Sequence, residues 1–101
     1  MSRYRISPKA REDLKSIYRY VAEDNPPAAG RLKKMFLDRF LLLAAQPLMG
    51  EAREDLAENL RMFSLGSYVI RCRPTSDGIE VAQVVHSARD LAALFLRRGM
   101  Q

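Results

Sequence analysis

The stretch from Leu60 to Asp90 constrains this chain most, because it holds three apolar-rich runs separated by short turn sequences. The runs are rich in Val, Ile, Tyr and Phe, and the turns are Gly66-Ser67 and residues 74–78 (PTSDG). Runs of this composition between Gly- and Asp-containing turns are typical of antiparallel strands joined by hairpins. The sequence therefore predicts a three-stranded meander.

The two-residue connection between the first two runs determines the pairing register of that hairpin. It places Leu65 opposite Tyr68, Phe63 opposite Ile70, and Arg61 opposite Cys72. The face predicted to be core consists of Phe63, Leu65, Tyr68, Ile70 and Cys72. The other face is predicted to be a half-apolar surface of Leu60, Met62, Ser64, Val69, Arg71 and Arg73. Cys72, the one cysteine, is expected to act as a small buried hydrophobe rather than a reactive thiol.

A short strand and a helix are predicted at the start of the chain. Residues 3–6 alternate polar and apolar side chains, which is typical of a half-buried strand. Ser7 is a suitable N-cap and Pro8 a suitable first helical residue. The apolar stripe of this helix is Ala10, Leu14, Ile17, Tyr18 and Val21.

A second helix is predicted after Asn25-Pro26-Pro27, with Asn25 as its N-cap. One face carries Leu32, Phe36, Phe40 and Leu43, flanked by Met35 and Leu42. Gly30 within this helix is unfavourable by about 1 kcal/mol against Ala, so close contact between the helices is its expected explanation. The short connection predicts an antiparallel helical hairpin.

Residues 51–59 (EAREDLAEN) are acidic and hold too few apolar residues for core, which predicts a loop or a short exposed helix. Ser87 can cap a last helix whose Leu91, Leu94 and Phe95 share one face and which Gly99 ends. The predicted order is β-α-α-β-β-β-α, an α+β fold in which a helical hairpin packs on one face of a largely antiparallel sheet. At 101 residues we expect a single domain, 1–101.

Composition limits the classes of protein that this chain can belong to. The apolar share of 48% and charged share of 29% are those of a globular protein. No apolar run approaches the 18 residues of a membrane-spanning helix, and the N-terminus lacks the apolar segment of a secretory signal. We therefore expect a cytoplasmic protein without a membrane partner.

The net charge of +5 is unevenly distributed along the chain. Residues 1–47 hold ten Lys/Arg against five Asp/Glu, and residues 48–101 hold seven against seven. A basic half suggests an acidic partner, either nucleic acid or an acidic protein segment. Simple solubility is an equally adequate explanation for this much charge.

No cofactor, metal site or catalytic residue is predicted, since the chain has no Gly-rich phosphate loop and no Cys/His metal spacing. His86, the one histidine, lies where the last predicted strand meets the last helix. Two roles are compatible with this position of His86: a structural hydrogen bond to neighbouring backbone, or a functional role. A catalytic triad built on it has no support in the spacing.

Arginines gather around the meander. Arg61, Arg71 and Arg73 have no acidic residue between Asn59 and Ser76 to neutralise them. Such a cluster could bind phosphates or carboxylates through bidentate hydrogen bonds. The alternative is internal pairing with Glu80, Asp90 or the acidic segment. The candidate target-binding surface is Arg61, Arg71, Arg73, His86 and Arg89.

The chain resembles the ParE branch of the RelE/ParE toxins of bacterial type II toxin-antitoxin systems. The matching pieces, in order, are SPKAREDLKSIYRYVAEDNPPAA, a long helix ending QPLMG, LRMFSLGSYVIRCRP and VVHSARDL. The resemblance implies the same β-α-α-β-β-β-α fold and neutralisation by a ParD-like antitoxin whose C-terminal segment wraps the toxin. The candidate antitoxin-binding residues are Arg11, Tyr18, Arg31 and Met35. Cys72 departs from the family pattern, in which many members carry an aromatic residue there.

The two branches of this superfamily differ in action. RelE-like members cleave messenger RNA on the ribosome with Lys/Arg residues near the meander and a Tyr or His near the C-terminus. Here residues 51–59 carry four acids and one Arg, which would repel a phosphate backbone, and no Tyr follows Tyr68. The resemblance to ParE therefore implies a toxin that acts on DNA gyrase without being an enzyme. Messenger RNA cleavage and an inactive or differently targeted relative remain as alternatives.

Overall fold

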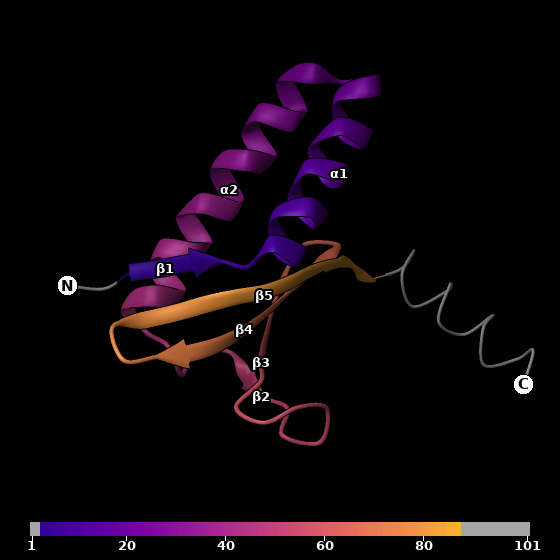
Figure 1. Cartoon of the computed structure of the whole chain (residues 1–101). Helices are drawn as coiled ribbons and strands as arrows, with labels where there is room; N and C mark the ends of the chain where they lie inside the picture. Colours follow the sequence, from indigo (N-terminus) through magenta and orange to yellow (C-terminus); the bar gives the residue numbers. More distant parts are fainter. Residues whose placement is uncertain (1–2, 88–101) are drawn as a thin grey trace, which may run out of the picture.

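The computed structural model describes residues 3–87 and shows a helical hairpin above a twisted sheet (Figure 1). The helices are α1 (Pro8–Asp24) and α2 (Pro26–Ala45). The strands are β1 (Arg3–Ile6), β2 (Glu51–Ala52), β3 (Arg61–Leu65), β4 (Tyr68–Thr75) and β5 (Gly78–His86). The predicted last helix and Arg89 lie outside the described residues.

The strands form one sheet in the order β1-β5-β4-β3-β2. Strand β1 runs parallel to β5, and the other neighbours are antiparallel. Both helices pack on the same face of the sheet, where α1 contacts β5 and α2 contacts β1 and β5. The predicted fold class is therefore confirmed. The sequence prediction missed β2, which pairs Glu51 and Ala52 with the start of β3.

The predicted register of the first hairpin is confirmed at all three pairs, since Leu65 faces Tyr68, Phe63 faces Ile70 and Arg61 faces Cys72. Gly66 in the turn has a φ of +58°, a conformation that glycine adopts without a Cβ penalty. The pairing of β4 with β5 contains a register shift between Arg71 and Cys72. Such an irregularity frees polar groups of the bulged strand from their usual partners.

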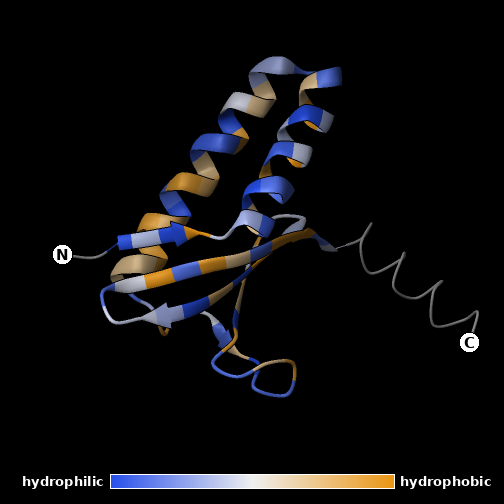
Figure 2. Cartoon of the chain, viewed as in Figure 1, coloured by the Kyte–Doolittle hydropathy of each residue, from blue (hydrophilic) through white to orange (hydrophobic). Residues whose placement is uncertain are grey.

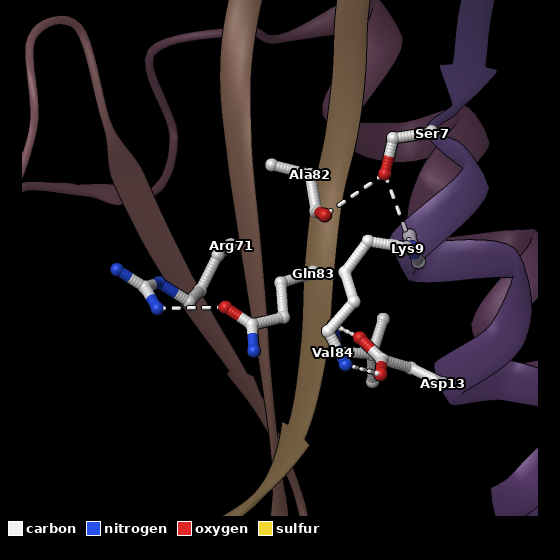
Figure 3. A network of polar contacts seen from close by, with 8 residues as sticks. Ser7, Lys9, Asp13, Arg71, Ala82, Gln83 and Val84 are labelled. Atoms are coloured by element: carbon white, nitrogen blue, oxygen red, sulfur yellow. Dashed lines mark hydrogen bonds and ion pairs between the residues drawn. The ribbon is translucent and has the colours of Figure 1, made fainter.

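Side chains at the start of α1 hydrogen-bond backbone groups of β5 (Figure 3). The Ser7 hydroxyl accepts the Ala10 N–H at 3.0 Å as an N-cap and donates to the Ala82 carbonyl at 2.9 Å. The Asp13 carboxylate accepts the Val84 N–H at 3.0 Å. The edge of β5 that extends beyond β1 is thus bonded to the helix, which fixes α1 against the sheet.

One hydrophobic core lies between the helices and the sheet. The predicted core residues Leu14, Ile17, Phe36, Phe40 and Ile70 are all buried. Phe63, also predicted in this core, is half-buried and packs against it. Cys72 is fully buried, and burial raises the pKa of its thiol, as expected of a small hydrophobe.

Two further sequence predictions are wrong. Leu60, expected on a half-apolar surface, is 2% exposed, since residues 51–59 turn back and bond to it: the Arg53 N–H donates to the Leu60 carbonyl at 2.8 Å. Gly30, expected at a close contact between helices, is exposed, and a Cβ there would meet nothing within 4 Å.

Candidate functional site

The face of the sheet opposite the helices carries most of the predicted target-binding residues. Strand residues alternate between the two faces, and Figure 2 shows hydrophilic and hydrophobic residues alternating along β5. Because Ile70, Cys72, Ile79, Val81 and Val84 are buried against the helices, their neighbours along β4 and β5 point the other way. We call this surface the open face. It consists of Arg5, Glu80, Arg73, Gln83, Arg71, Met62, Glu51, Val85, Val69 and Ser64.

Arg71 and Arg73 lie side by side on the open face, as predicted. Nη1 of Arg71 donates to Oε1 of Gln83 at 2.7 Å, and both side chains point away from α1 (Figure 3). Nε of Arg73 donates to the Glu58 carbonyl at 3.4 Å. Within residues 3–87 neither guanidinium forms an ion pair with a carboxylate, and Arg73 meets the acidic segment through the Glu58 carbonyl.

Arg61 lies on the other face, and the structure separates it from the cluster. Its Nε donates to the Gly50 carbonyl and its Nη2 to the Leu48 carbonyl, both at 3.0 Å. These bonds fasten the chain that leaves α2 onto the start of β3. Arg61 therefore has a structural partner, and its inclusion in a common surface with Arg71 and Arg73 is wrong.

His86 also lies on the helix side, at the far end of β5. Its ring packs edge-on against Tyr68, with centroids 5.2 Å apart, and Tyr68 in turn packs against Phe36 at 5.4 Å. Next to it, the N–H and hydroxyl of Ser87 both donate to the Ser67 carbonyl, at 2.7 and 2.9 Å. The end of β5 is thus held against the β3–β4 turn.

The acidic segment 51–59 borders the open face at the β2–β3 edge. Nε and Nη2 of Arg53 donate to the two carboxylate oxygens of Asp55 at 3.0 and 2.9 Å. This hydrogen bonding with Arg53 lowers the pKa of Asp55. The one cation of the segment is therefore paired with Asp55, which leaves Glu51, Glu54 and Glu58 as the net negative charge of the segment.

The candidate antitoxin-binding residues lie on the helical hairpin. Arg11, Arg31 and Met35 are exposed, whereas Tyr18 is half-buried and packs edge-on against Phe36 at 6.2 Å. Met35 lines a depression of about 340 Å³ together with Asp38, Arg39 and Leu42. The Arg39 guanidinium lies 5.8 Å from the centroid of the Phe63 ring. Sequence reasoning missed Arg39, although its spacing of four residues from Met35 placed both on one side of the helix.

Replacing Tyr18 with phenylalanine is expected to reduce the loss of stability at alkaline pH. Burial, together with the nearby Tyr4 phenol, raises the pKa of Tyr18 to about 12. An unfolded tyrosine ionises near about pH 10, so the unfolded state loses this proton first as the pH rises. The contribution of the neutral Tyr18 phenol to stability is therefore fully present below about pH 10 and is lost as the pH rises toward the folded-state pKa. Urea unfolding at pH 8 and pH 11 measures this loss.

The exposed Tyr20 of the same helix provides the control. Tyr20→Phe should leave the difference between the two pH values as in the wild type. An equal decline in the wild type and in Tyr18→Phe would contradict the burial of the Tyr18 phenol.

Residues 3–87 contain neither a metal-binding cluster nor a membrane-spanning helix. No group of three His, Cys, Asp or Glu side chains in this part of the chain is placed to hold a metal ion. Neither described helix is long and apolar enough to cross a membrane. The feature that remains is the pair of surfaces above, one on the sheet and one on the hairpin.

Comparisons with known proteins agree with the fold. Residues 4–91 match the family model described as the ParE toxin of the type II toxin-antitoxin system parDE. Toxin RelE3 of Caulobacter vibrioides is 28% identical over 88 residues, which cover 86% of this chain and 96% of that protein. A solved structure titled chromosomal ParDE TA system from P. aeruginosa superimposes with a TM-score of 0.71 at 18% identity, covering 85% of this chain and 96% of that one. Because the family model spans nearly the whole described chain, this protein belongs to the ParE toxin family of type II toxin-antitoxin systems.

Proposed function

We propose that this ParE-family toxin stops growth by inhibiting DNA gyrase, without being an enzyme, and that a ParD-like antitoxin neutralises it in the cytoplasm. Membership of the family supports the toxin and its antitoxin partner. On this proposal the open face meets the target, and the helical side that presents Arg11, Arg31 and Met35 meets the antitoxin. Tyr18 would contribute through the ring edge that remains accessible.

The acidic segment is the observation that favours gyrase over messenger RNA. A toxin that cuts RNA needs positive charge around the phosphate under attack. In this chain Glu51, Glu54 and Glu58 border the open face, and Asp55 neutralises the one arginine among them. A phosphate backbone would be repelled there.

The relative named toxin RelE3 keeps cleavage of messenger RNA as the second candidate function. The two candidates differ in what they need. Cleavage requires ribosomes and RNA, whereas inhibition of gyrase requires gyrase and supercoiled DNA.

The purified protein is expected to inhibit DNA supercoiling by purified bacterial gyrase and to leave messenger RNA on ribosomes intact. Induced expression without antitoxin should stop growth, cause filamentation and trigger a DNA-damage response. A supercoiling assay and primer extension on messenger RNA from the same culture measure the two activities. Codon-specific cleavage by the purified protein on ribosomes, with unaffected supercoiling, would replace this proposal by the RelE-type activity.

A further inference from the structure

Side chains of the open face lie in rows that run across the strands. Directly paired residues on one face have Cβ atoms roughly 5 Å apart, so each row acts as a unit. The first row is Arg5–Glu80–Arg73, the second is Gln83–Arg71–Met62–Glu51, and the third is Val85–Val69–Ser64. From the first row to the third, the surface therefore changes from charged, through mixed, to largely apolar.

The charged row is not built for a phosphate backbone. Glu80 lies between Arg5 and Arg73, so a chain of phosphates laid across this row would meet a carboxylate at its centre. Glu51 pairs with Met62, which places a further carboxylate on the open face in the next row. Each of these contacts would weaken the binding of a polyanion such as nucleic acid.

The open face also lacks the rings that single-stranded nucleic acid uses. Stacking of bases on aromatic side chains supplies much of such binding. Among residues 3–87 the aromatic rings of the sheet, Tyr4, Phe63 and Tyr68, pack against the core on the helix side. The apolar centre of the open face is made of Met62, Val69 and Val85, which are aliphatic and half-buried.

The guanidinium of Arg71 is positioned before any partner arrives. Gln83 takes up one Nη1–H of this side chain and holds it over the middle row. A guanidinium that is already ordered loses less entropy when its remaining donors bind a carboxylate. Arginine and methionine, which lie together here as Arg71 and Met62, are enriched at protein interfaces.

We infer that the open face docks a protein, through a surface of that protein which places carboxylates against Arg71 and Arg73 and a small apolar patch against Val69 and Val85. The inference rests on the proposed function, since it takes the target of the toxin to be a protein. Compared with the target-binding surface predicted from the sequence, this docking surface also includes Arg5, Glu80, Gln83, Val69 and Val85. It does not include Arg61.

The test compares two charge-matched double variants of the full chain. Arg71→Glu with Arg73→Glu reverses two charges on the open face, and Arg19→Glu with Lys33→Glu reverses two exposed charges on the helices. The first pair is expected to raise the concentration for half-inhibition of gyrase by about tenfold or more, since it sets like charges against the target. The second pair should leave this concentration within about twofold. Val69→Thr, which keeps the β-branched shape, is expected to weaken inhibition several-fold.

Growth inhibition in cells and fluorescence anisotropy with a DNA duplex and a single-stranded RNA complete the design. If the open-face variant alone loses toxicity while gyrase is unaffected by the wild type, gyrase is the wrong target and the docking surface stands. If the wild type inhibits gyrase and the two double variants weaken it equally, the surface is wrong and the proposed function stands. If the wild type binds nucleic acid at 150 mM salt and Arg71→Glu with Arg73→Glu abolishes this binding, the inference of a protein partner is wrong. If the wild type affects neither growth nor gyrase, both the docking surface and the proposed function are wrong. Circular dichroism and the urea midpoint establish that each variant is folded.

Discussion

Replacing Phe40 with alanine is expected to lower the free energy of unfolding by about 3–5 kcal/mol. Phe40 is 0% exposed, and its ring lies 5.7 Å from that of Tyr4 and 6.0 Å from that of Phe36. Truncation removes these contacts and leaves a cavity between α2 and β1, where the backbone of two elements limits collapse. Urea unfolding followed by circular dichroism measures the change.

The neighbouring Leu41 provides a matched control for this experiment. It lies on the same helix but is 56% exposed. Leu41→Ala should therefore change the free energy of unfolding by no more than about 0.5 kcal/mol. A similar cost for both substitutions would contradict the placement of Phe40 in the core.

Replacing Gly78 with alanine is expected to detach β1 from β5. A Cβ at this position would overlap the Arg3 carbonyl oxygen and lie 2.7 Å from its carbonyl carbon. Both are backbone atoms, so the clash is relieved only by moving one strand. Overpacking of this kind costs about 1–3 kcal/mol or more. Hydrogen exchange should show lost protection at the Arg3 and Ser7 amides, which donate to the carbonyls of Asp77 and Val81.

Gly30→Ala is the control for the same substitution in open space. A Cβ there meets no atom within 4 Å, and alanine is favoured over glycine within a helix by about 1 kcal/mol. This variant should therefore be more stable than the wild type. Unchanged stability and unchanged β1 protection in Gly78→Ala would disprove the close approach of the two strands.

Local chemistry was readable from the sequence. Ser7 and Asn25 cap their helices as predicted, accepting the N–H groups of Ala10 and Ala28. The two-residue turn at Gly66-Ser67 determined every pair of the first hairpin. These features depend on residues a few positions apart, whose geometry the chain itself restricts. The same alternation correctly placed Arg71 and Arg73 on one face and Cys72 on the other.

The composition of the candidate site depended on tertiary structure. Arg5 joins Arg73 through Glu80 because β1 pairs in parallel with β5, and no local signal predicts which strand lies beside β1. The role of Arg61 changed because the chain leaving α2 returns beside β3 and presents the carbonyls of Leu48 and Gly50. Leu60 is buried for the same reason, since residues 51–59 fold back over it.

The sequence alone thus determined the two described helices and their caps, the strands other than β2, one hairpin register and the identity of the charged residues. Which of those residues share a surface was decided by contacts such as that between Ser7 and Ala82, 75 residues apart. The physical reason is that periodicity and turn chemistry act between near neighbours, whereas the order of strands depends on the free energy of packing the whole core.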